Sequence, residues 1–325
     1  MRKYDEPDHT MNKNWNFHPK FPIGFYPFFE WPLSPKNWIK FIWNYWLKKS
    51  DRTILLLIAL FTYFFLFPHI EEMANLKFGW ISMVALRNYA LVFLVAGGLH
   101  WWFFTYNGQG KKFQYDTSYR NKQNKKFTFN NHVYDNMFWT LVYGVPIWIF
   151  FEVLLLFSFA SGNIKIFNFS DGWIWFCIWF PLLQIWQSFH FYCYHRALHI
   201  PFFYKIAHSV HHRNINPGPW SGYSMHPIEQ IIYISSLLIH FFIPSHPLHI
   251  LYHAYWLVLG TISTHAGYEN IWIKNKNFLN VGSFFHHLHH RYFNCNFGNP
   301  EIPFDRWFGT YHDGIGVVNK RMKHK

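Results

Sequence analysis

The sequence predicts an all-α integral membrane protein with about four transmembrane helices and a cytosol-facing, histidine-rich helical region. Charged residues make up 14% of the 325 residues, against about 25% in a typical soluble domain, and aromatic residues make up 24%. Apolar runs of membrane-crossing length occupy residues 53–192, and most of the 23 histidines follow them. These three observations predict a membrane-embedded first half and a second half that carries the chemistry.

The first 52 residues are predicted to form an interfacial segment. They are rich in Pro, Trp and Lys, and Trp side chains prefer the headgroup region of a bilayer. A short amphipathic helix over residues 38–47 is expected to lie on the membrane surface. The polar start of the chain lacks the apolar core of a cleavable signal peptide, so none is expected.

Four apolar runs in residues 53–192 are predicted to span the bilayer. Each run is near the length that crosses about 30 Å of hydrocarbon. The predicted spans are Thr53–Ile70, Trp80–Thr105, Asn136–Ala160 and Gly172–Tyr192. The remainder, residues 193–325, is predicted to be the catalytic region, with partly embedded helices.

The distribution of Lys and Arg among the loops predicts the orientation of these spans. Residues 1–53 and 107–135 are rich in Lys and Arg, whereas the loops 71–79 and 161–171 carry one lysine each. By the positive-inside rule, the N-terminus and the 107–135 loop are cytoplasmic. Four spans then return the chain to the cytoplasm, so we expect a multi-pass protein of a bacterial inner membrane or the endoplasmic reticulum, with its histidine clusters on the cytoplasmic side.

Two further apolar segments, 229–243 and 248–264, interrupt the histidine-rich half. The first is too short to cross a bilayer comfortably, and runs of this length are more often buried, interfacial or re-entrant. We expect partly embedded helices here. A pair of additional spans is the alternative, and it would preserve the sidedness of the histidine clusters.

Two charged residues lie inside the predicted spans. Arg87 and Glu152 are each expected roughly 10–12 Å below the outer surface, at a helical rise of 1.5 Å per residue. Because intramembrane charges usually pair or face a cavity, we predict an Arg87–Glu152 ion pair. Independent snorkelling of the two side chains is the alternative.

Three tight histidine clusters follow the last predicted span. They are His195 and His199, then His208, His211 and His212, then His286, His289 and His290. Residues three and four apart share one face of a helix, so each cluster is expected to point its imidazoles the same way. Neutral imidazole is the commonest metal ligand in proteins and suits iron, zinc and copper. Eight convergent histidines exceed the needs of one ion, so the pattern predicts a two-metal centre.

The segments between the clusters add candidates. His226 and His265 are further candidate ligands. A ligating imidazole usually donates its other N–H group to a carboxylate or a carbonyl, and the candidate carboxylate acceptors are Glu229, Glu269 and Asp305. His287 is expected to point away from its cluster. His240, His246, His249 and His253 are spaced as on an amphipathic helix and are expected to be core or interfacial residues rather than ligands.

These motifs resemble the fatty acid hydroxylase/sterol desaturase superfamily of integral-membrane di-iron oxidases. The signature of that superfamily is HxxxH, then HxxHH, then a distant HxxHH, and it stands here as His195–His199, His208–His212 and His286–His290. The flanking segments are similar as well, namely Met225–Glu229, His265–Glu269 and Phe304–Thr310. The resemblance covers about residues 190–313.

The resemblance implies two iron ions and dioxygen as co-substrate, with zinc able to replace iron during purification. The ligands that it implies are His195, His199, His208, His211, His212, His286, His289 and His290, with His265 and His226 added. The implied substrate is a lipid, such as a sterol, a fatty acyl chain or a sphingolipid, which is hydroxylated or desaturated.

The sequence shows no electron-carrying motif of its own, neither a GxGxxG fingerprint nor a four-cysteine iron–sulfur spacing. An external donor, namely a ferredoxin, a cytochrome or a reductase, is therefore implied. The basic loop 107–135 and the Lys-rich segment 320–325 are candidate docking surfaces for an acidic carrier. Retention of positive charge on the cytoplasmic side is the alternative explanation.

Two other functions compete with an oxidase. A divalent-metal transporter or binding protein needs ionisable residues along a membrane path, and the predicted spans offer few. A membrane zinc hydrolase would keep three protein ligands and a catalytic carboxylate, and no HExxH motif occurs. Nucleic acid is not an expected partner because no recognition motif accompanies the net charge of +13. The three cysteines have the spacing of neither a disulfide framework nor a thiolate metal site.

Overall fold

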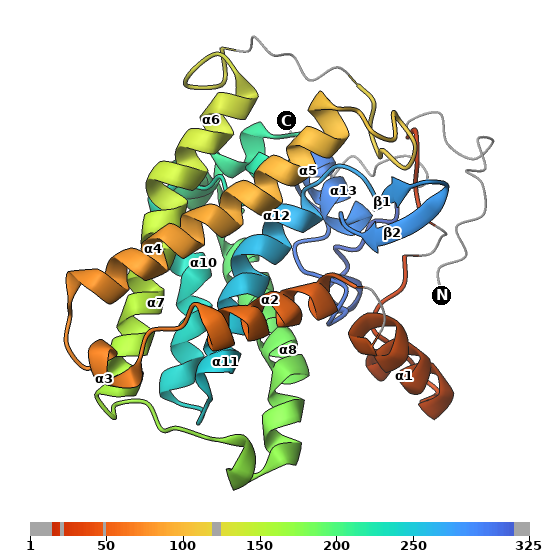
Figure 1. The fold of residues 1–325 in the computed structure, drawn as a ribbon. Helices are drawn as coiled ribbons and strands as arrows, with labels where there is room; N and C mark the ends of the chain where they lie inside the picture. Colours follow the sequence, from red (N-terminus) through yellow and green to blue (C-terminus); the bar gives the residue numbers. More distant parts are fainter. Residues whose placement is uncertain (1–14, 20–22, 48–49, 119–124, 315–325) are drawn as a thin grey trace.

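The structure is a computed structural model that describes residues 15–19, 23–47, 50–118 and 125–314. The candidate docking segment 320–325 and residues 119–124 of the basic loop lie outside the described residues. Helices form most of the described chain (Figure 1).

The α-helices up to the first histidine cluster are α1 (Pro35–Ile42), α2 (Asp51–Phe65), α3 (Ile70–Met73), α4 (Phe78–Val92), α5 (Gly98–His100), α6 (His132–Phe138), α7 (Val145–Ala160) and α8 (Trp173–Leu198). The later elements are α9 (Pro201–Phe203), α10 (Pro227–Ile234), α11 (Pro247–Tyr255), α12 (Thr261–Thr264), β1 (Asn270–Ile273), β2 (Lys276–Asn280), α13 (Phe284–Tyr292) and α14 (Phe304–Trp307).

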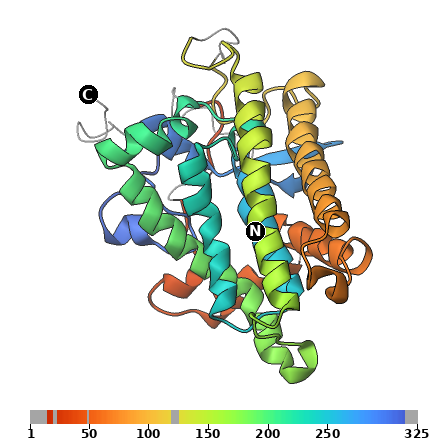
Figure 2. The same cartoon turned by 90° about the vertical axis from the view of Figure 1, so that its left-hand side faces the viewer.

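Two long rods are built from consecutive helices. Wider helical turns join α4 to α5 and α6 to α7, so that Phe78–Thr105 and His132–Ala160 are continuous helices of 28 and 29 residues. Both are long and apolar enough to cross a membrane. Helix α4 packs against α7, and Figure 2 shows the two rods side by side. The predicted ion pair is present, because the Arg87 guanidinium binds the Glu152 carboxylate, which also accepts a hydrogen bond of 2.8 Å from Asn88.

The other two predicted spans differ from expectation in length. Helix α2 has 15 residues and ends at Phe65, which gives it an axial length of about 22 Å. Helix α8 has 26 residues and continues beyond Tyr192, so that the first histidine of the clusters lies on the same helix. In the described chain, two of the four predicted spans therefore combine sufficient length with sufficient apolar character.

Helix α11 lies at the centre of the molecule. All nine of its residues are buried, and it packs against α2, α7 and α8. Its histidines belong to the core, as expected, and they are satisfied locally. His253 Nδ1 lies 3.2 Å from His240 Nε2, and His249 Nε2 lies 2.9 Å from the Phe176 carbonyl oxygen.

A small β-hairpin corrects the all-α expectation. Strands β1 and β2 pair antiparallel, and Lys274 and Asn275 make the turn with positive φ angles. Ile271, Trp272 and Ile273 favour a strand, because β-branched and aromatic side chains fit a pleated surface. The hairpin joins α12 to α13, and both of these helices border the histidine clusters.

Gly282 closes the connection from the hairpin into α13. Its φ is +60°, and a Cβ atom at this position would lie 1.9 Å from the Tyr268 carbonyl oxygen. Only glycine fits this backbone. The Ser283 hydroxyl then accepts a hydrogen bond from the His286 N–H group and caps α13.

Candidate metal centre

Nine of the ten candidate ligand histidines converge into two adjacent groups. The five-histidine group contains His195, His199, His208, His212 and His289. The four-histidine group contains His211, His265, His286 and His290. Within each group, one ring nitrogen from every member lies within 4.8 Å of those of all the others. The groups adjoin, since the ring centroids of His212 and His290 are 4.8 Å apart.

The helical repeat explains how the clusters divide between the groups. His208 and His212 are four residues apart and join the same group, as do His286 and His290. His211 points to the other group, because successive residues are rotated by about 100° around a helix. The expectation that all imidazoles of one cluster point the same way is therefore wrong for the second and third clusters, because each of these contributes histidines to both groups.

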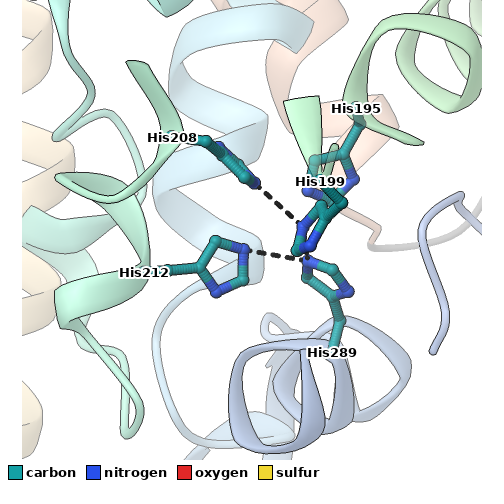
Figure 3. Close-up of side chains that lie close together, drawn as sticks. All are labelled: His195, His199, His208, His212 and His289. Atoms are coloured by element: carbon teal, nitrogen blue, oxygen red, sulfur yellow. Dashed lines mark hydrogen bonds between the residues drawn. The ribbon is translucent and has the colours of Figure 1, made fainter. Parts of the chain in front are cut away.

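Figure 3 shows the rings of the five-histidine group pointing toward one another. They come from α8, from the segment between α9 and α10, and from α13. The Nε2 atom of His199 lies 3.1 Å from that of His208 and 3.2 Å from that of His289. The Nε2 atoms of His212 and His289 are 3.0 Å apart.

The outer ring nitrogens of this group determine its protonation. His195 Nδ1 lies 2.6 Å from the Phe297 carbonyl oxygen, and His289 Nδ1 lies 2.6 Å from the Cys295 carbonyl oxygen. A carbonyl oxygen only accepts, so each Nδ1 carries the proton and each Nε2 presents its lone pair to the centre of the group. This arrangement is typical of metal-ligating histidines.

The four-histidine group contains a triangle of Nε2 atoms. The atoms of His265, His286 and His290 are separated by 3.0, 3.1 and 3.1 Å. A point equidistant from all three lies about 1.8 Å from each, close to the roughly 2.0–2.1 Å of a metal–imidazole bond. His265 Nδ1 donates to the Thr261 carbonyl oxygen at 2.8 Å, so its Nε2 lone pair also faces inward.

Burial keeps these rings neutral. It lowers the pKa of His208, His212 and His289 well below the usual value of a histidine, and neighbouring histidines lower it further. The pKa of His211 falls to about 4 for the same primary reason. At neutral pH the groups therefore present lone pairs at close range, and a divalent cation between them removes the repulsion. The donor set fits two metal ions.

Each candidate carboxylate has a different position relative to the rings. Glu229 Oε1 accepts a hydrogen bond of 2.7 Å from His208 Nδ1, and burial raises the pKa of Glu229. Asp305 accepts from the N–H groups of Phe297 and Gly298 at 2.9 and 2.7 Å, so it holds the loop whose carbonyl receives His195. Glu269 instead accepts from the Tyr115 hydroxyl at 2.7 Å.

Two other histidines lie outside the groups. His226 is the candidate ligand that the structure does not bring to the centre, because its Nδ1 caps α10 at the Ile228 N–H group and its ring lies near Trp139. His287 points away, as expected, with its ring near Trp15 and Tyr115.

A cavity of about 820 Å³ reaches both groups. Histidines of both groups form part of its wall, namely His195, His208, His211, His265 and His286. Phe191, Tyr233 and Trp256 add aromatic surface, and the cavity extends to α1. The candidate metal centre therefore opens onto a chamber whose wall combines aromatic and polar side chains.

The sequence does not mark the backbone carbonyl oxygens that accept hydrogen bonds from the histidine rings. They belong to Ser224, Thr261, Cys295 and Phe297. A backbone carbonyl is present at every residue, so no side-chain pattern marks these four. Only their location near the motifs around His226, His265 and Phe304 hinted at a role.

Comparisons with known proteins identify the segment that carries the site. A family model described as fatty acid hydroxylase matches residues 180–310. A Delta(7)-sterol 5(6)-desaturase of Gibberella zeae is 29% identical over 165 residues, which are 46% of this chain and 50% of the relative. A methylsterol monooxygenase candidate of Dictyostelium discoideum is 35% identical over 130 residues, covering 38% of this chain and 47% of the relative.

A second sterol desaturase, from Aspergillus fumigatus, is 33% identical over 135 residues, which are 41% of this chain and 37% of the relative. The chain thus matches half or less of the length of each of these relatives. No solved structure matches. All nine histidines of the two groups lie within residues 180–310, and this segment belongs with the fatty acid hydroxylase/sterol desaturase superfamily.

Proposed function

We propose that this protein is a membrane oxidoreductase that hydroxylates or desaturates a lipid, using two iron ions and dioxygen. The observation that carries the proposal is the pair of adjacent histidine groups opening onto one cavity that is partly lined by aromatic side chains. The relatives named as sterol desaturases and as a methylsterol monooxygenase candidate support a lipid substrate and include both reaction types.

The five-histidine group would hold one iron and the four-histidine group the other. Imidazole suits iron, and the buried rings keep their lone pairs available. When bound, the two irons supply the reduction of dioxygen and the removal of hydrogen from an unactivated C–H bond. Glu229 orients His208 through its Nδ1 proton, and Asp305 orients His195 through the Phe297 carbonyl. Glu269 holds Tyr115, whose ring packs against Phe284 and His287 of α13.

The cavity walls would position the lipid and exclude water. Phe191 lies one helical turn from His195 on α8, so a chain packed on Phe191 passes close to the ligands. Exclusion of water protects a reactive site from side reactions. The far end of the cavity reaches Phe41 of α1. Neighbouring Ile39 and Trp43 are exposed, and we propose that they lie in the bilayer surface where the lipid arrives.

We further propose a multi-pass arrangement with the catalytic region 193–325 on the cytoplasmic side of the bacterial inner membrane or the endoplasmic reticulum. The two long apolar helices and the basic loop 107–135 support this orientation. An external ferredoxin, cytochrome or reductase would deliver the two electrons that the reaction with dioxygen requires.

Iron content and lipid oxidation, measured together on protein produced with iron and purified without added zinc, test the proposal. We expect two irons per chain and loss of a C–H bond that depends on dioxygen and on an electron donor. His208→Ala is expected to lower both the iron content per chain and the rate of lipid oxidation. His226→Ala is the matched control, because this ring lies outside both groups.

Full lipid oxidation by the His208→Ala variant would contradict the proposal. Protein that binds zinc, acquires no iron and hydrolyses a lipid would instead identify a hydrolase. Iron binding that exchanges across a vesicle membrane without lipid oxidation would identify a transporter.

A further inference from the structure

The wall of the cavity carries two buried hydrogen-bond acceptors, outside the histidine groups, that have no partner among the described residues. Glu301 and Gln187 are 4% and 3% exposed, and both line the cavity. Glu301 Oε2 and Gln187 Oε1 have no hydrogen-bond partner among the described residues. Buried acceptors left unsatisfied destabilise the protein that contains them, so a partner from outside the chain is expected.

The other oxygen of Glu301 is already engaged. Glu301 Oε1 accepts hydrogen bonds from the Arg52 guanidinium at 3.1 Å and from the Tyr26 hydroxyl at 3.2 Å. Arg52 also donates to Gln184 Oε1 at 3.0 Å and to Asp51 at 3.1 Å. These hydrogen bonds hold the Glu301 carboxylate in place. They also engage the N–H groups of Arg52 with oxygen atoms of the protein itself.

Helix α8 relates this polar end of the cavity to the candidate metal centre. Gln187, Phe191 and His195 follow at intervals of four residues, so they lie on one face of the helix, and all three line the cavity. Gln187 and His195 are separated by roughly 12 Å along the helix axis. A molecule that meets Gln187 with one end therefore passes Phe191 before it reaches the histidines.

We propose that Glu301 and Gln187 form a subsite that recognises the hydroxyl group of a lipid. The inference rests on the proposed function only in taking the cavity as the place where the lipid substrate binds. The hydroxyl donates its proton to an oxygen that otherwise lacks a donor. This anchors the lipid at the far end of the cavity, with its apolar body along Phe191 toward the histidines.

The same chemistry disfavours a free fatty acid. A carboxylate has no proton to donate, and it would face the unpaired oxygens of Glu301 and Gln187. The charged residues at this end of the cavity are Arg52 and Lys40 on one side and Asp51 and Glu301 on the other. Formal charge therefore balances, and the discrimination rests on the missing proton donor.

Equilibrium binding of radiolabelled cholesterol to the purified, iron-loaded protein in detergent tests the subsite. The unlabelled competitors are cholesterol, cholesterol methyl ether, octadecan-1-ol and octadecanoate. We expect cholesterol to bind at least about tenfold more tightly than cholesterol methyl ether, which lacks the hydroxyl donor. We expect the same of octadecan-1-ol relative to octadecanoate, if a chain lipid enters the cavity. Competition by cholesterol but not by octadecan-1-ol identifies a sterol as the source of the hydroxyl. Saturable binding of radiolabelled octadecan-1-ol without saturable binding of cholesterol identifies a chain lipid.

Two variants separate hydrogen bonding from steric fit. In Glu301→Gln, the amide oxygen is retained by Arg52 and the amide N–H group faces the cavity, so the ether can accept from it. We expect the preference for cholesterol over its methyl ether to fall to about one, although the cavity keeps its shape. Gln187→Leu removes the second acceptor and is expected to weaken cholesterol binding several-fold. Glu72→Gln, which changes an exposed carboxylate, is the control.

Equal binding of cholesterol and its methyl ether to the unaltered protein would overturn the inference, because water would then satisfy the two acceptors. So would an unchanged preference in both variants, provided that their thermal stability matches that of the control. Binding needs no dioxygen and no electron donor. A hydroxyl preference without lipid oxidation would therefore refute the proposed function alone, and lipid oxidation without a hydroxyl preference would refute the subsite alone.

Discussion

His211 and His212 are consecutive in the sequence, yet their rings belong to different histidine groups. Their ring planes are 87° apart, and their centroids are separated by 5.7 Å. His211 Nδ1 lies 3.2 Å from the Ser224 carbonyl oxygen, which turns its Nε2 toward the four-histidine group. This dipeptide links the two candidate metal sites through one backbone.

The division between the groups predicts unequal effects of removing either ring. His211→Ala leaves three histidines in its group, whereas His212→Ala leaves four. We expect His211→Ala to reduce iron toward one per chain, and His212→Ala to retain more iron while losing lipid oxidation by about a hundredfold or more. Metal analysis and Mössbauer spectroscopy of the two variants check this. Identical iron loss in both would contradict the division into two sites.

Glu229 is expected to act through the ring that it orients. Glu229→Leu removes the acceptor for His208 Nδ1, and loss of such a partner typically lowers metal affinity or activity by about 10- to 100-fold. Glu229→Gln is the matched control, because its amide oxygen accepts the same N–H group. The measurement is iron affinity together with the rate of lipid oxidation. Equal loss in the two variants would show that the charge, rather than the hydrogen bond, matters.

The Arg87–Glu152 pair is expected to stabilise the contact between α4 and α7. Glu152→Gln leaves a buried guanidinium without its counter-charge, which typically costs about 3–5 kcal/mol. Replacement of both residues, as Arg87→Met with Glu152→Leu, is expected to recover most of this loss. Thermal unfolding in detergent measures both, with Glu72→Gln as the exposed control. A Glu152→Gln variant as stable as the control would contradict a structural role.

The buried histidines make the metal-free protein sensitive to acid. His211 has a pKa of about 4 when folded and about 6.5 when unfolded, so the unfolded chain takes up its proton first as the pH falls. The free energy of unfolding is therefore constant above about pH 6.5 and decreases from there to about pH 4, by roughly 3 kcal/mol for this residue alone.

Thermal unfolding of chelator-treated protein between pH 8 and 4 measures this dependence. His211→Gln is expected to show a smaller decrease over the same interval, because the substituted side chain does not titrate. A stability that stays level from pH 7 to 4.5 would contradict neutral, buried rings.

Local patterns predicted much of the fold because they depend on neighbouring residues. The apolar runs predicted the rods Phe78–Thr105 and His132–Ala160, and the charge pattern predicted the Arg87–Glu152 pair. The end of α2 at Phe65 and the extension of α8 to Leu198 were not predicted. Apolar composition alone does not mark where a helix ends. The hairpin β1–β2 was missed because its apolar run, Ile271–Ile273, is too short to show the period of a strand.

The sequence by itself determined which residue types the protein brings to its centre. The spacing of the histidines, read together with the superfamily signature, named eight of the nine members of the two groups, and the segment around His265 added the ninth. Only the tertiary structure decided how those rings divide, why His226 is excluded and that Glu301 and Gln187 face the same cavity. The physical reason is that spacing fixes directions around one helix, whereas the distance between rings on different helices depends on how those helices pack.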